Sequence, residues 1–143
     1  MNMKPQRLVF TAVVAAFGLL LVACQQPQGG GSLSVEHSGG ITFLRSDGHS
    51  DAPDIYYQGT VTIGPGDCLY VEFPGEAQEL VILDDDTEVT ADGLITPEGF
   101  EVAYGEQVNV VRTNAGHYDM EIEGVEGCDD SGRSGIAFVG DPR

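Results

Sequence analysis

Hydrophobic and polar side chains alternate with a period of two along most of the chain after Leu33. Tyr118–Glu123 places three large residues on one face and three acids on the other. Such a period is typical of a strand with one buried face and one solvated face. The pattern therefore predicts antiparallel sheets. Further strands of this kind are expected around Ile41–Phe43, Val61–Ile63, Leu69–Phe73, Phe100–Tyr104 and Val108–Val110.

Two stretches are apolar without alternation. Leu80–Leu83 is typical of a central strand covered on both faces, and Ile136–Val139 is predicted as a similar closing strand. Glycine, proline, asparagine and aspartate fill the segments between the runs, as tight turns require. Many short strands at close spacing indicate a β-sandwich or a small barrel. We therefore expect residues 33–143 to form one all-β domain, a small antiparallel β-sandwich, without a helix.

The first 23 residues have a different pattern. Lys4 and Arg7 precede an apolar run, Leu8–Ala23, that carries no charge. A basic start, an apolar helix and then small residues are the order of a signal peptide. The run is also shorter than the roughly 20 residues that a permanent membrane span needs. Residues 1–23 are therefore predicted to be a helical export signal that is removed.

The end of this leader, Leu21–Cys24, resembles the lipobox of bacterial lipoprotein precursors. The resemblance implies diacylglyceryl transfer to the Cys24 sulfur and cleavage before Cys24 by signal peptidase II. Gln25 follows where an Asp would imply inner-membrane retention, so similarity to enterobacterial lipoproteins implies the outer membrane, or the outer face of the plasma membrane in a cell without one. Residues 24–32 are rich in Gly and Gln and predict a flexible, lipidated tether.

The stretch Asn114–Ile122 resembles the penultimate strand of immunoglobulin-like and PKD-like domains, in which a Gly-x-Tyr opens a strand. Gly116 and Tyr118 match that pattern. Antibody-type domains have a cysteine two residues after the tyrosine, where this chain has Met120. The resemblance implies an Ig-like form of sandwich.

The net charge of the domain limits the classes of partner that it can bind. All 23 acidic residues follow Cys24, whereas only four arginines do, which leaves a formal charge of −19 after the leader is removed. A field of this sign repels nucleic acid and anionic lipid head groups. It favours cations, basic proteins or a high-salt habitat, and it serves solubility in any case.

Two cysteines remain once Cys24 carries lipid. Cysteines in an exported domain most often pair, so Cys68 and Cys128 predict a disulfide. The pair would tie the beginning of an early strand to a late segment. A redox or metal pair is the alternative, but redox sites normally use neighbouring cysteines, and these two are far apart in sequence.

Carboxylates are the best candidates for a metal site. Asp84, Asp85 and Asp86, with further acids nearby, could bind calcium, which takes oxygen ligands. They do not match an EF-hand loop, whose sixth and twelfth positions would be Val89 and Ile95. A solvated hairpin loop is the alternative.

A second metal pattern resembles the ligand loop of cupredoxins. His117 and Met120 have the appropriate type and spacing, but a blue-copper site also needs a cysteine thiolate just upstream, where this chain has Asn114. A surface histidine beside a core methionine is the alternative.

Catalytic patterns are not apparent. Ser134 lies in Gly-Arg-Ser-Gly, which is not the Gly-x-Ser-x-Gly of a nucleophile elbow. The abundant carboxylates on strand faces are more typical of a solvated surface. We therefore expect a lipid-anchored, non-enzymatic module that binds or scaffolds an envelope protein. Calcium binding through the acidic loops is the alternative function, and an unrecognised envelope enzyme is the third.

Overall fold

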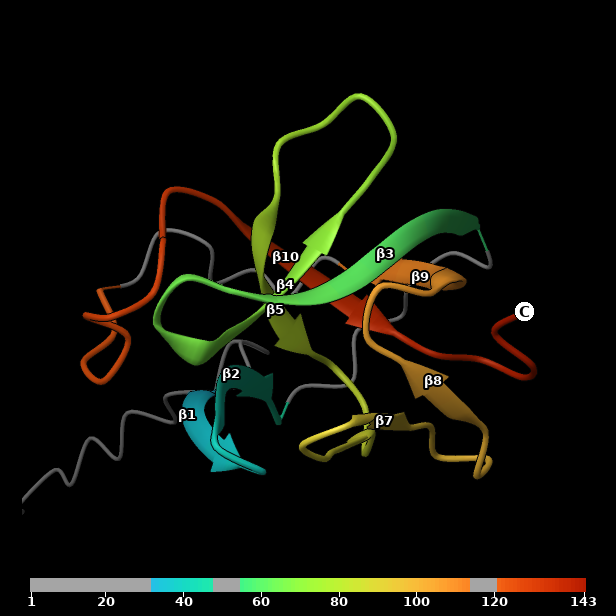
Figure 1. Cartoon of the computed structure of the whole chain (residues 1–143), viewed down its shortest axis with the longest axis horizontal. Helices are drawn as coiled ribbons and strands as arrows, with labels where there is room; N and C mark the ends of the chain where they lie inside the picture. Colours follow the sequence, from blue (N-terminus) through green and yellow to red (C-terminus); the bar gives the residue numbers. More distant parts are fainter. Residues whose placement is uncertain (1–31, 48–54, 114–120) are drawn as a thin grey trace, which may run out of the picture.

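The computed structural model describes residues 32–47, 55–113 and 121–143, and their regular structure is almost entirely β-strand (Figure 1). One short 3-10 helix, η1 (Pro65–Asp67), interrupts the strands. The strands are β1 (Leu33–Ser38), β2 (Ile41–Ser46), β3 (Tyr56–Gly64), β4 (Cys68–Glu72), β5 (Glu79–Leu83), β6 (Glu88–Val89), β7 (Gly93–Ile95), β8 (Glu101–Ala103), β9 (Gln107–Thr113) and β10 (Arg133–Ala137).

The strands form a seven-stranded sheet and a three-stranded sheet, which confirms the predicted all-β class and is consistent with a small β-sandwich. The large sheet has the order β1-β2-β4-β3-β9-β10-β5, and β5 also pairs with β2 and β4. The sheet therefore curls until its far end meets its beginning, and this curl encloses a core. The small sheet has the order β6-β7-β8.

Most of the pairings are antiparallel, as predicted, but the large sheet is mixed. Strand β5 runs parallel to β10 and to β2, and β2 runs parallel to β4. Parallel strands are usually buried on both faces, and their sequences are continuous apolar runs. The uninterrupted run Leu80–Leu83 fits this position, since its four side chains are fully buried.

Strand β5 separates two hydrophobic clusters. Its odd-numbered residues, Val81 and Leu83, face the first cluster, and its even-numbered residues, Leu80 and Ile82, face the second. The prediction of a central strand covered on both faces is therefore confirmed. The neighbouring strands β2 and β4 divide their side chains between the clusters in the same way.

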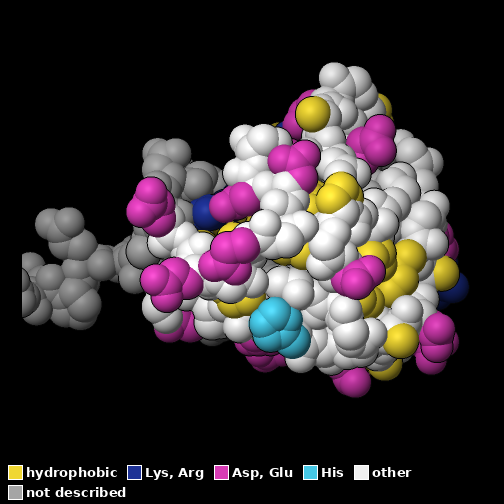
Figure 2. Space-filling view, turned by 60° about the vertical axis from the view of Figure 1, so that its left-hand side comes forward, with side chains coloured by type: hydrophobic (Ala, Val, Ile, Leu, Met, Phe, Trp, Pro, Cys, Tyr) yellow, Lys and Arg dark blue, Asp and Glu magenta, His cyan; other side chains and the backbone are white. Residues whose placement is uncertain are grey.

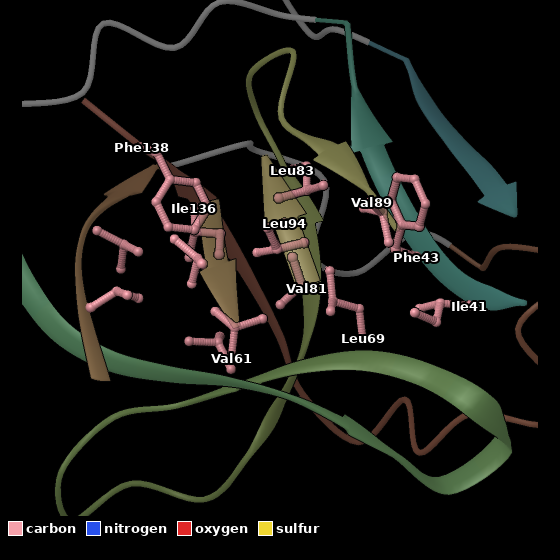
Figure 3. Packing of buried hydrophobic residues seen from close by; sticks show 14 of the residues in the cluster. Ile41, Phe43, Val61, Leu69, Val81, Leu83, Val89, Leu94, Ile136 and Phe138 are labelled. Carbon is pink, nitrogen blue, oxygen red and sulfur yellow. The ribbon is translucent and has the colours of Figure 1, made fainter. Parts of the chain in front are cut away.

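The first cluster fills the inside of the curled sheet and is closed by the three-stranded sheet. Figure 3 shows Val89 and Leu94 of the small sheet among residues from β2, β4, β5 and β10. The second cluster lies on the other face of β4 and β5, where Leu33 and Val35 of β1 pack against it. Val125, from the segment between β9 and β10, completes that cluster.

The structure differs from the predicted strands at several points. Strands β6 and β7 have two and three residues, too few to show a period in sequence. Glu121–Glu123, the described end of the predicted strand Tyr118–Glu123, does not lie in a strand, and the rest of that stretch lies outside the described residues. The closing strand begins earlier than predicted, at Arg133, and ends at Ala137.

Candidate functional site

The predicted lipidation site, Cys24, lies outside the described residues, as do the leader and most of the tether. The described part of the chain has no helix long and apolar enough to cross a bilayer. The Ig-like stretch Asn114–Ile122 and the cupredoxin-like pair His117 and Met120 also lie wholly or mainly outside it, so these interpretations stay predictions.

The predicted disulfide between Cys68 and Cys128 is present, with Cα atoms 5.7 Å apart. Cys68 is the first residue of β4 and is buried, and Cys128 lies in the segment that leads to β10. The bond therefore fastens that segment to the second hydrophobic cluster, to which both cysteines belong.

A buried tyrosine reinforces this connection. The hydroxyl of Tyr70 donates a hydrogen bond to the Pro65 carbonyl at 3.0 Å and accepts one from the Asp129 amide at 2.6 Å. Burial raises the pKa of this hydroxyl, which keeps it protonated and able to donate. Tyr70 thus joins η1 to the residue that follows Cys128 and serves the fold.

The acidic loop Asp84–Asp86 is organised by the middle carboxylate. One oxygen of Asp85 accepts a hydrogen bond from the Thr87 amide at 2.9 Å, and the other accepts one from the Phe138 amide at 2.7 Å. The second bond crosses to the segment that follows β10. Asp85 therefore satisfies two backbone donors and holds two distant segments together.

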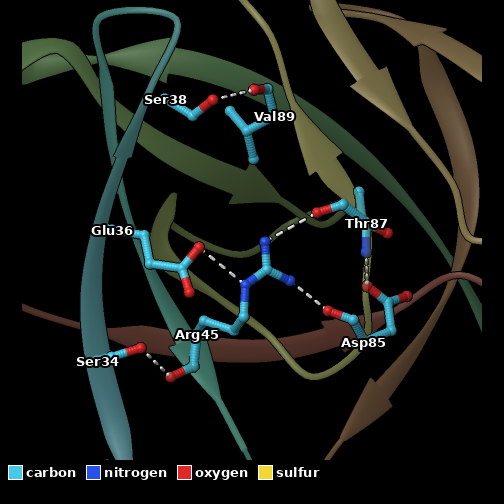
Figure 4. A network of polar contacts seen from close by, with 7 residues as sticks. All are labelled: Ser34, Glu36, Ser38, Arg45, Asp85, Thr87 and Val89. Carbon is cyan, nitrogen blue, oxygen red and sulfur yellow. Dashed lines mark hydrogen bonds and ion pairs between the residues drawn. The ribbon is translucent and has the colours of Figure 1, made fainter.

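Arg45 on β2 completes this network (Figure 4). Its Nε atom lies 2.9 Å from the Glu36 carboxylate on β1, and its Nη2 donates to the Thr87 carbonyl at 2.9 Å. Its Nη1 donates to the Asp85 carbonyl. One guanidinium thus ties the edge strand β1 to the loop between β5 and β6, and the loop is fixed from both sides.

The three aspartates have different environments. Asp84 is 8% exposed, and its Oδ1 has no hydrogen-bond partner in the described part of the chain, whereas Asp86 is exposed. Within the described ranges, no group of three or more His, Cys, Asp or Glu side chains is placed to hold a metal ion. The calcium interpretation of Asp84–Asp86 stays a prediction.

Ser134, the serine considered for hydrolysis, is a strand residue of β10 paired with Val81. It is 3% exposed, so its side chain belongs to the interior of the sheet. At this exposure a substrate could not reach the hydroxyl without a rearrangement of the fold.

One hollow lies over the small sheet and is lined by acids. It has a volume of about 440 Å³, and Asp92, Glu101 and Glu106 contribute carboxylates to its wall. The hydroxyl of Tyr104 closes the underlying turn: its single proton lies between the Thr90 and Gly93 carbonyl oxygens, which are 2.6 and 3.0 Å from the hydroxyl oxygen. Burial, and then the Asp92 charge, raise the pKa of Tyr104 to about 12.

A second hollow lies where the beginning of β3 meets the C-terminal segment. It has a volume of about 470 Å³ and is lined by Tyr56, Asn109, Val139, Gly140 and Asp141. Two of these side chains are large and exposed, Tyr56 at 51% and Val139 at 46%. The sequence pattern missed this surface because Val139 was expected to continue the closing strand and because Tyr56 alternates poorly with its neighbours.

Comparisons of the chain with models of protein families, with curated proteins and with solved structures found no match.

Proposed function

We propose that this protein is a lipid-anchored, non-enzymatic β-domain that binds or scaffolds another protein at the cell envelope. The observation that carries the proposal is the lipobox-like Leu21–Cys24 at the end of a charged-then-apolar leader. Strand β1 begins at Leu33, directly after the 24–32 tether, so the folded domain would stand close to the membrane.

The disulfide supports an exported location. Such bonds form and persist in oxidising compartments and are rare in the cytosol. Cys68 and Cys128 are held at bonding distance by packed elements of the fold. By similarity to lipoproteins with a residue other than Asp after the lipidated cysteine, we assign the protein to the outer membrane where the cell has one.

The polar interactions of the fold support a binding role over a catalytic one. The Asp85 carboxylate accepts from backbone amides, the Arg45 guanidinium donates to backbone carbonyls of the same loop, and the Tyr70 hydroxyl joins η1 to the segment after Cys128. These groups stabilise the domain, and Ser134 is buried in the sheet. The surface offers hollows and exposed apolar side chains, which are features of recognition.

Mass spectrometry of the full chain expressed in a bacterium tests the anchor. We expect a product that begins at Cys24 and carries diacylglycerol on its sulfur, and we expect labelled palmitate to be incorporated. Cys24→Ser should abolish the labelling, whereas Gln25→Ala, the matched control, should retain it. A bare thiol, or a product with the leader still attached, would overturn the proposal.

Calcium binding at the Asp84–Asp86 loop is the second candidate function. One observation favours it, which is the buried Asp84 oxygen without a hydrogen-bond partner among the described residues. A bound cation would compensate such a group. Thermal melting in millimolar calcium and in EDTA tests this: a higher Tm with calcium, lost in Asp84→Asn, would support the site, and identical melting curves would remove it.

A further inference from the structure

We propose that the surface formed by Tyr56 and Val139, hereafter the distal patch, docks a segment of a partner protein that presents an apolar side chain between basic residues. This inference rests on the proposed envelope-binding function and names the surface and the partner chemistry. The patch borders the hollow between the beginning of β3 and the C-terminal segment.

Exposed hydrophobic surface is concentrated at this place. The large hydrophobic side chains that are exposed in the described part of the chain are Ile55 at 53%, Tyr56 at 51%, Val139 at 46% and Tyr57 at 41%. All of them come from two segments, residues 55–57 and the segment after β10. The Tyr57 ring lies against Phe73, edge to face at 6.2 Å, whereas Tyr56 and Val139 both line the hollow and form the distal patch. Clustered exposed apolar residues mark interaction sites, whereas scattered ones are ordinary.

The hollow beside the patch is fixed in shape by the C-terminal segment. The Asn109 amide donates to the Pro142 carbonyl at 2.7 Å, which attaches that segment to β9. The Gly140 amide donates to the Glu98 carboxylate at 3.4 Å, and Gly140 itself has φ +68°, a conformation that glycine adopts readily. A surface held in this way loses little conformational freedom when a partner binds.

The position of the patch favours a protein partner over the bilayer. Figure 1 shows β1, which follows the tether, at the lower left, and the C-terminus and the beginning of β3 at the right. The distal patch thus lies at the end of the domain opposite β1, the strand that follows the predicted tether. An anchored domain would present this end to other envelope proteins.

The charge of the domain selects a basic partner. Every arginine after the leader is already ion-paired within the domain, and the domain has no lysine. Carboxylates therefore remain in large excess, and Figure 2 shows them spread over the displayed face. At the hollow, Asp141 is paired with Arg143 at 3.2 Å, and the Glu98 carboxylate accepts from the amide of the neighbouring Gly140. A partner that flanks its apolar anchor with Lys or Arg is complementary to this field.

Binding of defined peptides to the mature lipoprotein tests the proposal. The protein is held in nanodiscs of neutral phosphatidylcholine, with empty nanodiscs as the blank. The probe is a short fluorescein-labelled peptide that alternates lysine with leucine and phenylalanine. Two control peptides replace the apolar residues with serine or the lysines with glutamate. The readout is fluorescence anisotropy at low and at high salt.

We expect the basic apolar peptide to bind at least about tenfold more tightly than either control, which corresponds to roughly 1.4 kcal/mol. The double variant Tyr56→Ser with Val139→Ser should weaken this binding about tenfold, as expected for exposed anchors of an interface. His37→Ser, an exposed ring on β1, is the matched control and should leave binding unchanged. Thermal melting verifies that each variant is folded, and Val139→Lys gives a second test by charge repulsion.

Three outcomes would overturn the proposal. Equal binding of the lysine–serine peptide would mean that charge alone attracts the probe. Flotation of the nanodisc-held protein with phosphatidylcholine vesicles in the absence of peptide, lost in the double variant Tyr56→Ser with Val139→Ser, would make the patch a lipid-contact surface. Patch-dependent dimers in sedimentation velocity would make it a self-association surface. The mass of the Cys24 product is measured before the peptide assay, so a failure of the anchor is recognised separately from a failure of the patch.

Discussion

Asp85 shows how a residue that looks like a metal ligand in sequence acts as a structural acceptor in the fold. Asp85→Ala would leave the buried amides of Thr87 and Phe138 without their acceptor. We expect a loss of about 1–3 kcal/mol in the free energy of unfolding, the usual cost of unsatisfied buried donors. Urea unfolding followed by circular dichroism measures it.

The neighbouring Asp86 provides a matched control for this substitution. It is exposed, so Asp86→Ala should change the free energy of unfolding by less than about 0.5 kcal/mol. Equal effects at the two positions would mean that the loop responds to charge and not to the hydrogen bonds of Asp85. The sequence could not distinguish these residues, because the Phe138 amide that selects Asp85 lies 53 positions away.

Tyr104 gives a pH dependence with a definite sign. Its pKa in the fold is raised from 10.0 to about 12, so the protonated form is favoured in the folded state. The contribution of Tyr104 to the free energy of unfolding is therefore fully present below about pH 10 and is lost as the pH rises toward 12. Titration of tyrosinate absorbance should show a late ionisation step that belongs to Tyr104.

Replacement of the hydroxyl checks the assignment of that late step. Tyr104→Phe should remove it from the absorbance titration, whereas Tyr57→Phe, at an exposed ring, should leave it in place. If the late step survives in Tyr104→Phe, another buried tyrosine is responsible. Tyr70 is the next candidate, since burial also raises its pKa.

At the scale of elements, the connection between η1 and the Cys128 segment depends on close backbone contact. Gly66 has φ +74°, and a Cβ at this position would lie 2.0 Å from the Gly127 carbonyl oxygen. We expect Gly66→Ala to lower the free energy of unfolding by more than about 2 kcal/mol, since strain and steric clash add. Chemical denaturation in non-reducing buffer measures this loss.

Substitution at Gly75 separates the cost of backbone strain from the cost of steric clash. Gly75 has φ +80°, but nothing lies within 4 Å of a Cβ built there. Gly75→Ala should therefore cost only the backbone term, about 1–2 kcal/mol. A loss at Gly66 no larger than at Gly75 would mean that the loop moves aside and that the contact with Gly127 does not hold the disulfide segment.

Comparison of the predicted and observed strands shows which of them a sequence pattern is sufficient to predict. Alternation identified β2, β3, β4, β8 and β9. It reflects a solvated face most clearly in β8, whereas β2 and β4 place alternate side chains in the two hydrophobic clusters. The run Leu80–Leu83 identified β5, and cysteine count identified the disulfide. Strands β6 and β7 were not predicted from the sequence, because their packing against the first cluster stabilises them and no local pattern marks them.

At the scale of the whole molecule, the curl of the large sheet could not be predicted. Its parallel pairings join β2 to β4, β2 to β5 and β5 to β10, and these strands are separated by long stretches of chain. Local periodicity specifies which face of a strand is buried but not its neighbour. The distal patch follows from the same long-range geometry, which places the beginning of β3 beside the C-terminal segment.

Net charge, in contrast, is fixed by composition and acts on the entire fold. Nineteen uncompensated negative charges after the leader repel one another, and salt screens this repulsion, with a Debye length falling from about 30 Å at 0.01 M to about 3 Å at 1 M. The arginine ion pairs oppose the effect, but exposed pairs contribute only about 0–1 kcal/mol each. We therefore expect Tm to rise with sodium chloride.

Variants with fewer carboxylates test whether charge repulsion causes the expected rise of Tm with salt. Glu88 and Glu101 are exposed, so Glu88→Gln with Glu101→Gln removes two charges and leaves the core unchanged. This variant should melt higher than the native chain at low salt and at the same temperature at high salt, because screening already removes the repulsion there. A Tm that falls with salt would mean that the stabilising ion pairs of Arg45, Arg112 and Arg133 outweigh the repulsion between the excess carboxylates. The acidic surface would then serve recognition and solubility without lowering the stability of the fold.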